Sequence, residues 1–220
     1  MKYNSVFDII GPIMVGPSSS HTAGAAIIGR LARSLFGRQP ARADIHLFGS
    51  FAETYKGHAT DVAIVGGLLD YDTDDSRIPQ SLHYAREAGM EVAFHIEEAV
   101  PEHPNTVLIR LSDSQGTQDM VGISIGGGKV EITELNGFKL KLGGMYPAIL
   151  VLHTDRFGAI SVVTNVLADH CVNIGHMEVS RKEIGKMALM VIEVDQNVPE
   201  SILDEIRSLE QVTQITKMNT

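Results

Sequence analysis

The sequence predicts a two-domain protein of mixed α/β (α+β) class, with a less regular α/β domain over residues 1–145 and a small βαββαβ domain over residues 146–220. Its 220 residues suffice for one large domain or two small ones, at roughly 100–200 residues per domain. The stretch K-L-G-G-M-Y-P at 141–147 contains two glycines and a proline, which interrupt regular structure and mark the division. After it, strand and helix patterns alternate in a regular order.

The N-terminal domain is expected to begin with helices. An alanine-rich stretch places Arg30 and Arg33 on the polar side of a first helix. Four aspartates between residues 70 and 76 predict a solvated loop. The elements expected up to residue 89 are a helix over Thr22–Phe36, a strand over Ala43–Phe48, a helix over Gly57–Leu69 and a helix over Pro79–Ala88 that Gly89 ends.

From Glu91 onward the pattern changes to strands. Runs of β-branched and apolar residues, separated by turn-forming residues, predict a series of strands before the division. They cover Val92–Ile96, Thr106–Leu111, Met120–Ile125, Val130–Leu135 and Phe138–Leu142.

The C-terminal domain has the clearest periodicity. In its first helix Ile160, Val163 and Leu167 recur at helical spacing on one face. Its expected elements are strand Ala148–His153, helix Ala159–His170, strand Asn173–Arg181, the apolar central strand Met187–Val194, a helix opened by Pro199 and strand Val212–Lys217. The order βαββαβ predicts the ferredoxin-like arrangement, in which two helices cover one face of an antiparallel sheet.

Composition excludes several classes of protein. The 18 Lys and Arg against 27 Asp and Glu give a net charge of −9 without any basic run, so no nucleic-acid partner is expected. The longest apolar runs are far shorter than the ~20 residues that a membrane helix needs, so no membrane partner is expected. The single cysteine, Cys171, cannot form an internal disulfide framework or a complete thiolate iron–sulfur or zinc site, so no metal site is expected in this chain. We expect an acidic, cytoplasmic globular protein.

The strongest local motif is G-P-S-S-S-H-T at 16–22, where three hydroxyls and an imidazole precede a helix. A helix cap accounts for one serine, because its side-chain oxygen accepts a backbone N–H that has no partner within the helix. The other hydroxyls exceed what capping needs, and a helix N-terminus also binds carboxylate or phosphate oxygens. His21 is therefore a candidate acid, base or substrate hydrogen-bond partner. Capping and a functional loop both remain open from the residues alone.

A second polar cluster, G-S-F-A-E-T-Y-K-G-H-A-T-D at 49–61, connects a strand to a helix. Its polar and titratable side chains are Ser50, Glu53, Thr54, Lys56, His58, Thr60 and Asp61. This density favours a functional site, but a polar surface loop that caps the next helix also explains it. Lys56 could hold an anion, although the glycine spacing of a phosphate-binding P-loop is missing.

Three further features favour structural explanations. The stretch G-I-S-I-G-G-G-K at 122–129 lies between two strand patterns and is interpreted as a hairpin turn with positive φ angles. The stretch H-T-D-R-F-G at 153–158 could receive the carboxylate of a small amino acid at the following helix, but turn formation explains it by itself. Cys171 is expected to be a small buried apolar residue.

These residues resemble two known families. Residues 148–218, with T-D-R-F-G and N-I-G-H-M-E-V-S-R, resemble the ACT domain, a regulatory βαββαβ module that pairs side by side and often binds amino acids. The run S-V-F-D-I-I-G-P-I-M-V-G-P-S-S-S-H-T-A-G and the 49–61 cluster resemble the beta chain of the iron–sulfur-dependent L-serine dehydratase of Gram-positive bacteria. The stretches E-E-A-V-P-E-H-P-N-T and G-I-S-I-G-G-G-K-V-E-I-T-E-L-N-G-F fit that family too, so the resemblance spans essentially the whole chain. One departure is Ala59, where the family usually has glycine in K-G-H-G-T-D.

The resemblance implies conversion of L-serine to pyruvate and ammonia, with a [4Fe-4S] cluster as Lewis acid on the leaving hydroxyl. It implies that a partner alpha chain ligates the cluster, and that residues 1 to about 142 resemble the allosteric substrate-binding domain of some phosphoglycerate dehydrogenases. It also implies that the S-S-S-H-T loop reaches into the alpha chain's active site. The residues expected to take part are His21 as the catalytic residue and Ser18, Ser19, Ser20 and Thr22 as substrate-binding residues.

Two weaker expectations concern other parts of the chain. Lys56, His58 and Asp61 are expected to support the site, and Asp155 and Gly158 are expected to form an effector site in an ACT domain that self-associates. A different class of function stays open: a non-catalytic amino-acid sensor that regulates another partner. The S-S-S-H-T loop favours the enzyme subunit, since a sensor does not need an exposed histidine beside three hydroxyls.

Overall fold

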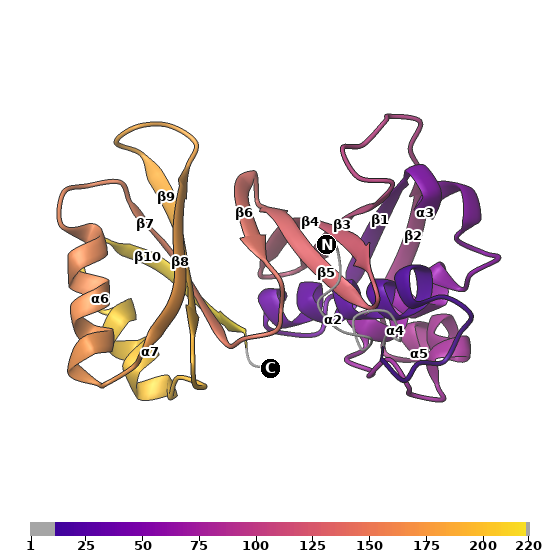
Figure 1. Cartoon of the computed structure of the whole chain (residues 1–220), viewed down its shortest axis with the longest axis horizontal. Helices are drawn as coiled ribbons and strands as arrows, with labels where there is room; N and C mark the ends of the chain where they lie inside the picture. Colours follow the sequence, from indigo (N-terminus) through magenta and orange to yellow (C-terminus); the bar gives the residue numbers. More distant parts are fainter. Residues whose placement is uncertain (1–11, 219–220) are drawn as a thin grey trace. The chain divides into compact units, whose positions relative to one another are not determined.

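The computed structural model describes residues 12–218, which form two compact units that divide between Asn136 and Gly137 (Figure 1). The predicted mixed α/β class is confirmed, while the domain boundary between 145 and 146 stays a prediction. Residues 5–11, the start of the first family motif, lie outside the described residues. Within residues 12–218, no helix has both the length and the apolar character needed to cross a membrane.

In the first unit, helices dominate the first half of the chain and consecutive strands the second half. Its elements are the π-helical turn η1 (Ser19–Ala23), α2 (Gly24–Phe36), β1 (Arg42–Phe48), α3 (Gly49–Thr54), α4 (Thr60–Leu68), the 3-10 turn η2 (Ile78–Gln80), α5 (Ser81–Glu87), β2 (Glu91–Ile96), β3 (Asn105–Asp113), β4 (Gly116–Gly126) and β5 (Lys129–Leu135). Every helix and strand expected from the sequence is present. The short helix α3 and the π-helical turn were not expected, and α4 begins later than predicted.

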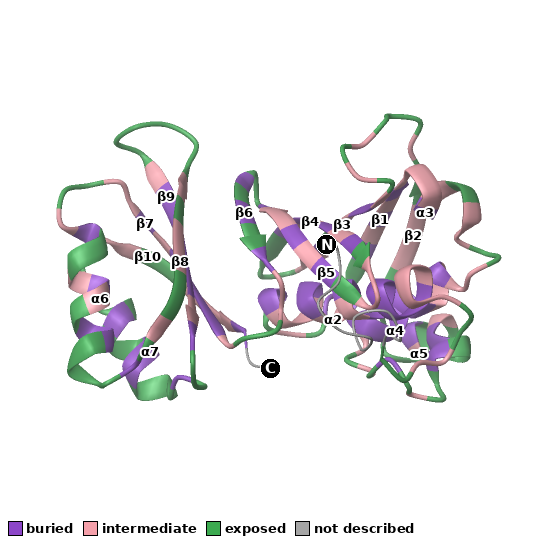
Figure 2. Cartoon of the chain, viewed as in Figure 1, coloured by how far each residue is buried: buried purple, intermediate pink, exposed green. Residues whose placement is uncertain are grey.

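In the sheet of the first unit the strands follow the order β2-β1-β3-β4-β5. The pair β1–β2 is parallel, and the pairs β1–β3, β3–β4 and β4–β5 are antiparallel. Along β1 the burial alternates, with Ala43, Ile45 and Leu47 fully buried. Figure 2 shows α2 and α4 largely buried as well. The apolar residues of β1 share one face of the sheet, and α2 also contacts β3, β4 and β5.

Two glycines bring α2 and α4 into direct backbone contact. A Cβ atom on Gly67 would lie 2.1 Å from the carbonyl oxygen of Ala26, and one on Gly29 would lie 2.2 Å from the carbonyl oxygen of Ile64. Only hydrogen atoms fit at this crossing. The Gly66–Gly67 pair therefore serves close helix packing, although glycine weakens a helix by itself.

The hairpin between β4 and β5 has the predicted turn. Gly126, Gly127 and Gly128 have φ angles of 101°, 64° and 78°. Gly122, at the start of the same motif, lies within β4. The glycine triplet is thus a backbone requirement of the turn.

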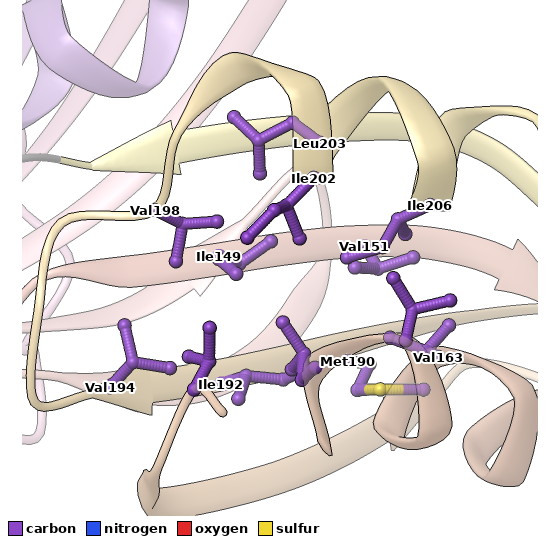
Figure 3. Close-up of a cluster of buried hydrophobic side chains, with 13 residues drawn as sticks. Ile149, Val151, Val163, Met190, Ile192, Val194, Val198, Ile202, Leu203 and Ile206 are labelled. Carbon is purple, nitrogen blue, oxygen red and sulfur yellow. The ribbon is translucent and has the colours of Figure 1, made fainter. Parts of the chain in front are cut away.

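The second unit confirms the predicted βαββαβ order. The strand β6 (Phe138–Leu142) comes before this motif. The elements of the motif are β7 (Ala148–Thr154), α6 (Ala159–Asp169), β8 (Ile174–Arg181), β9 (Met187–Val194), α7 (Glu200–Arg207) and β10 (Val212–Met218). The strands form an antiparallel sheet in the order β10-β7-β9-β8. Figure 3 shows Ile202 and Ile206 of α7 packed over β7 in a fully apolar core that also contains Met190 and Val163. At about 25 cal/mol per Å² of apolar area, such burial is the main stabilising contribution in a small domain.

The expectation that Cys171 is buried is wrong. Cys171 is exposed and has a φ of 54°, just past the end of α6. Its backbone N–H donates to the carbonyl of Ala168, which closes the helix in a left-handed turn. The chain reverses at this point, so the side chain points to solvent instead of continuing the apolar face of the helix.

Candidate functional site

The S-S-S-H-T loop is wound into the π-helical turn that leads directly into α2. The Oγ atom of Ser18 accepts the backbone N–H of His21 at 3.1 Å. The Ser18 carbonyl accepts the N–H groups of Thr22 at 2.8 Å and Ala23 at 3.3 Å. Short π-helical segments of this kind are frequent at functional sites. The predicted capping role of a serine is present, and it belongs to Ser18.

The His21 imidazole is held on several sides. Its Nε2 atom lies 3.0 Å from the Oγ atom of Ser50, and its Nδ1 atom lies 3.4 Å from the Oγ atom of Ser18. The ring of Phe51 meets it edge-on with a centroid distance of 5.3 Å. The ring of His58 does the same at 4.8 Å. Both ring nitrogens of His21 therefore face hydroxyl groups. The neighbouring aromatic rings restrict the orientation of the imidazole plane.

The surroundings of His21 favour its neutral form. Burial lowers the pKa of His21 below its ordinary value of 6.5, and the nearby His58 lowers it further. Removal from water disfavours a charged imidazolium, as does a second imidazole that can also become positive. At neutral pH His21 is thus an uncharged imidazole that can accept a proton.

Ser50 reaches His21 because the chain turns sharply where β1 ends. Gly49 has a φ of 51°, and a Cβ atom there would lie 2.6 Å from the carbonyl oxygen of Pro104. The same carbonyl accepts the N–H of Ser50 at 2.8 Å. The Ser50 carbonyl accepts the Thr54 hydroxyl at 2.7 Å, which closes α3. Glycine is the residue that allows this close approach.

His58 joins the site through backbone and side chain. Its carbonyl accepts the Thr22 hydroxyl at 2.9 Å, which ties the 49–61 cluster to the S-S-S-H-T loop. Its Nδ1 atom and the Oγ1 atom of Thr60 are buried and have no hydrogen-bond partner among residues 12–218. Ala59, between them, has a φ of 57° and a ψ of 28°. This left-handed conformation costs alanine more than it would cost glycine.

The structure brings four of the predicted site residues into contact: Ser18, His21, Thr22 and His58. Ser19 and Ser20 lie half-buried in the same turn. Sequence reasoning places Ser50 in the polar cluster without assigning it a role, and it does not single out Phe51 at all. A hydroxyl at the end of a buried strand was the available signal for Ser50, but its distance to His21 depends on the tertiary fold.

Lys56 and Asp61 are not placed against His21. Lys56 is exposed, and its Nζ atom lies 5.6 Å from the ring centroid of Tyr55. Asp61 accepts the N–H of Val62 at 2.8 Å in the first turn of α4, where a carboxylate stabilises a helix. Their support of the site stays a prediction, and helix stabilisation is the role of Asp61 that the contacts show.

In the turn after β7, the Asp155 side chain already has partners within this chain. The Asp155 carboxylate accepts the N–H of Gly185 at 2.9 Å and contacts the guanidinium of Arg181 at 3.3 Å. The Gly185 hydrogen bond first, and Arg181 to a smaller extent, lower the pKa of Asp155. Gly158 has a φ of 85° at the start of α6. The predicted effector residues thus shape and brace this turn, and effector binding there stays a prediction.

Between residues 12 and 218 the metal-ligating side chains do not gather into a site. In the part of the chain that the structure describes, no group of three or more histidine, cysteine, aspartate or glutamate side chains could hold a metal ion. An iron–sulfur cluster needs several thiolates, and the full sequence contains only Cys171.

The fold and the site define a two-part protein, in which an α/β unit carries a histidine–hydroxyl site and a ferredoxin-like unit of the ACT type follows it. The family model of the serine dehydratase beta chain matches residues 5–89, and that of the ACT domain matches residues 148–211. The chain is 62% identical over 218 residues to a probable L-serine dehydratase beta chain of Bacillus subtilis, covering 99% of both chains. It is 37% identical over 211 residues to the L-serine dehydratase beta chain of Peptoniphilus asaccharolyticus, covering 95% of both. The chain belongs to the family of L-serine dehydratase beta chains.

A more distant likeness concerns another enzyme. The chain is 25% identical over 188 residues to a D-3-phosphoglycerate dehydrogenase of Synechocystis, a match that covers 83% of this chain and 33% of that protein. The family resemblance drawn from the motifs is confirmed by the two family models and by the two L-serine dehydratase beta chains, not by this match.

Proposed function

We propose that this chain is one half of a cytoplasmic L-serine ammonia-lyase that converts L-serine to pyruvate and ammonia. In this proposal a separate alpha chain ligates the [4Fe-4S] cluster, and the enzyme is active only when both chains assemble. The names of the relatives, L-serine dehydratase beta chain, support the substrate and the division into chains. The single cysteine supports placing the cluster on the alpha chain.

One observation carries the catalytic assignment: His21 is a half-buried, neutral imidazole beside a loop of hydroxyls. Dehydration of serine removes the Cα proton and the β-hydroxyl, and the resulting enamine tautomerises and is hydrolysed to pyruvate and ammonia. We assign the removal of the Cα proton to His21, which is uncharged at neutral pH. The hydroxyls of Ser18, Ser19, Ser20 and Thr22 then bind the substrate carboxylate, together with backbone N–H groups of the turn.

The test is a set of His21 variants in the co-expressed two-chain enzyme, assayed with L-serine without oxygen. His21→Ala, His21→Asn and His21→Gln should each lower kcat by ~10²-fold or more, the usual scale for loss of an acid–base group. Chain association and the absorption of the cluster should persist, and the isolated beta chain should be colourless and inactive. If His21→Asn or His21→Gln works at nearly the wild-type rate, the loop only binds substrate and the base belongs to the alpha chain.

The pH dependence provides a second test of the same assignment. The pKa of His21 lies below 6.5 in the folded chain, so the rate should fall only when the pH drops through that lowered value. Protonation of His21 also costs folding free energy, because the unfolded chain binds the proton more readily, so this group makes the chain less stable as the pH falls below 6.5. An acid limb clearly above pH 6.5 would contradict a role for the neutral His21.

The second unit is assigned a regulatory or assembly role. Pairing of two ACT units edge to edge would cover the exposed edges of a small sheet. Binding of serine near Asp155 and Gly158 would have to coexist with the Asp155–Gly185 hydrogen bond or replace it.

A further inference from the structure

The hydroxyl of Ser50 has no role in the function proposed so far, yet it makes the shorter of the two contacts to the His21 ring. The Ser50 Oγ to Nε2 distance is 3.0 Å, whereas the Ser18 Oγ to Nδ1 distance is 3.4 Å. A distance of 3.0 Å is ordinary for a hydrogen bond, while 3.4 Å is long. Ser50 is therefore the stronger partner of the imidazole.

The contacts of Ser18 suit a ring proton on the opposite nitrogen, Nε2. A hydroxyl has one proton to donate and two lone pairs. The Ser18 oxygen already accepts the backbone N–H of His21 at 3.1 Å, so its own proton is free to point toward Nδ1. With that donation, Nδ1 is an acceptor and the ring proton lies on Nε2, which is the tautomer that we infer. In this tautomer the Nε2–H group donates to the Ser50 oxygen at 3.0 Å.

The position of Ser50 is fixed by its backbone. Its N–H donates to the Pro104 carbonyl and its carbonyl accepts the Thr54 hydroxyl, at 2.8 and 2.7 Å. Gly49 pairs with Asn105 in an antiparallel bridge, which ties the start of α3 to the start of β3. The adjacent Phe51 is fully buried, and its ring packs against the imidazole in a T-shaped pair. Such support from several sides is what holds a reacting group in one orientation.

We propose that Ser50 is a positioning residue that holds His21 in the Nε2–H tautomer, so that Nδ1 is the nitrogen that accepts a proton. The proposal rests on the function assigned to His21 above, and it specifies which atom of that residue reacts. The weak contact of Nδ1 with Ser18 leaves this nitrogen available when substrate enters the loop. Without Ser50 both tautomers become populated, and part of the enzyme presents the wrong nitrogen.

The first test uses the full-length chain alone and does not depend on activity. Long-range ¹H–¹⁵N NMR spectra distinguish the two neutral tautomers of histidine, and the His21→Asn spectrum identifies the signals of His21. We expect the Nε2–H pattern in the wild type, a mixture of both patterns in Ser50→Ala, and the Nε2–H pattern again in Ser50→Thr, which keeps the hydroxyl. A wild-type Nδ1–H pattern, or a Ser50→Ala spectrum identical to the wild type, would overturn the proposal.

The second test measures the assembled two-chain enzyme. Ser50→Ala should lower kcat by about 10- to 100-fold with little change in KM, the range found when a supporting hydrogen-bond partner is removed. Ser50→Thr should restore most of the rate, and Ser76→Ala, in an exposed loop, is the matched control. A Ser50→Ala enzyme with the wild-type kcat would overturn the proposal.

The two tests separate the failure of this proposal from the failure of the proposed function. If the spectra show the expected tautomers but His21→Asn keeps the wild-type rate, Ser50 positions His21 and the catalytic assignment of His21 is wrong. If His21→Asn is inactive but Ser50→Ala changes neither spectrum nor rate, the catalytic assignment stands and Ser50 has no positioning role.

Discussion

The substitution Gly67→Ala should separate the two helices that support the site. The added Cβ atom would lie 2.1 Å from the Ala26 carbonyl oxygen and 2.9 Å from the Cα atom of Gly29. Ordinary contacts begin at 3.4 Å, so α2 and α4 must move apart by 3.4 − 2.1 = 1.3 Å at this point. Both partners are backbone atoms, so no side chain can rotate away.

The expected loss of stability follows from two opposing contributions. Overpacking of a well-packed interior costs about 1–3 kcal/mol, and a backbone clash belongs at the upper end of that range. Alanine in place of glycine returns about 1 kcal/mol of helix propensity. We expect Gly67→Ala to lower the free energy of unfolding by about 2 kcal/mol.

Urea unfolding followed by circular dichroism measures this loss, and the neighbouring glycine provides the control. A Cβ atom on Gly66 would meet the Cγ1 atom of Ile78 at 3.1 Å, and that flexible side chain can yield. Gly66→Ala should therefore be neutral or stabilise the chain by up to about 1 kcal/mol. Equal stability of Gly67→Ala and the wild type, or an equal loss in both variants, would refute the argument from backbone contact.

The remaining predictions concern single features of each unit. Ala59→Gly should raise the free energy of unfolding, measured in urea, by about 0.5–1 kcal/mol. The reason is that Ala59 has a φ of 57°, and this left-handed conformation costs alanine more than glycine. A loss of stability would mean that packing contacts of the Ala59 side chain contribute more than this conformational cost. The fragment 137–220, which corresponds to the second compact unit, should self-associate in analytical ultracentrifugation, whereas a clean monomer at high micromolar concentration would argue against pairing of the ACT units. Titration of L-serine into the same fragment without measurable heat would remove serine as its effector.

The fold could be predicted from the sequence to the extent that each element has its own periodicity. The strands Phe138–Leu142 and Met187–Val194 have the predicted ends. The first alternates apolar residues with lysines and the second is a nearly continuous apolar run, and turn residues bound both. The short helix α3 has six residues, too few to show a helical repeat, and the sharp turn at Gly49 depends on the distant Pro104. Local patterns do not contain that contact.

The site was predicted less completely for a related reason. The S-S-S-H-T loop stands out because its hydroxyls exceed what a helix cap needs, and His58 stands out by the density of titratable groups around it. The pairing of His21 with Ser50 joins residues 29 positions apart and arises only when α3 folds beside the π-helical turn. Cys171 was misjudged because a left-handed residue at a helix end interrupts the apolar face on which it was placed.

The contacts of the His21 ring that the structure shows all come from the first unit, and this has a consequence for subunit association. The three segments that carry Ser18, Ser50 and His58 are brought together when this chain folds. The conformational entropy lost in ordering these segments is therefore part of the cost of folding the beta chain. It does not have to be lost again when the chain binds a partner. In an assembly with an alpha chain, the His21 side of the site would then be preorganised before substrate or partner arrives.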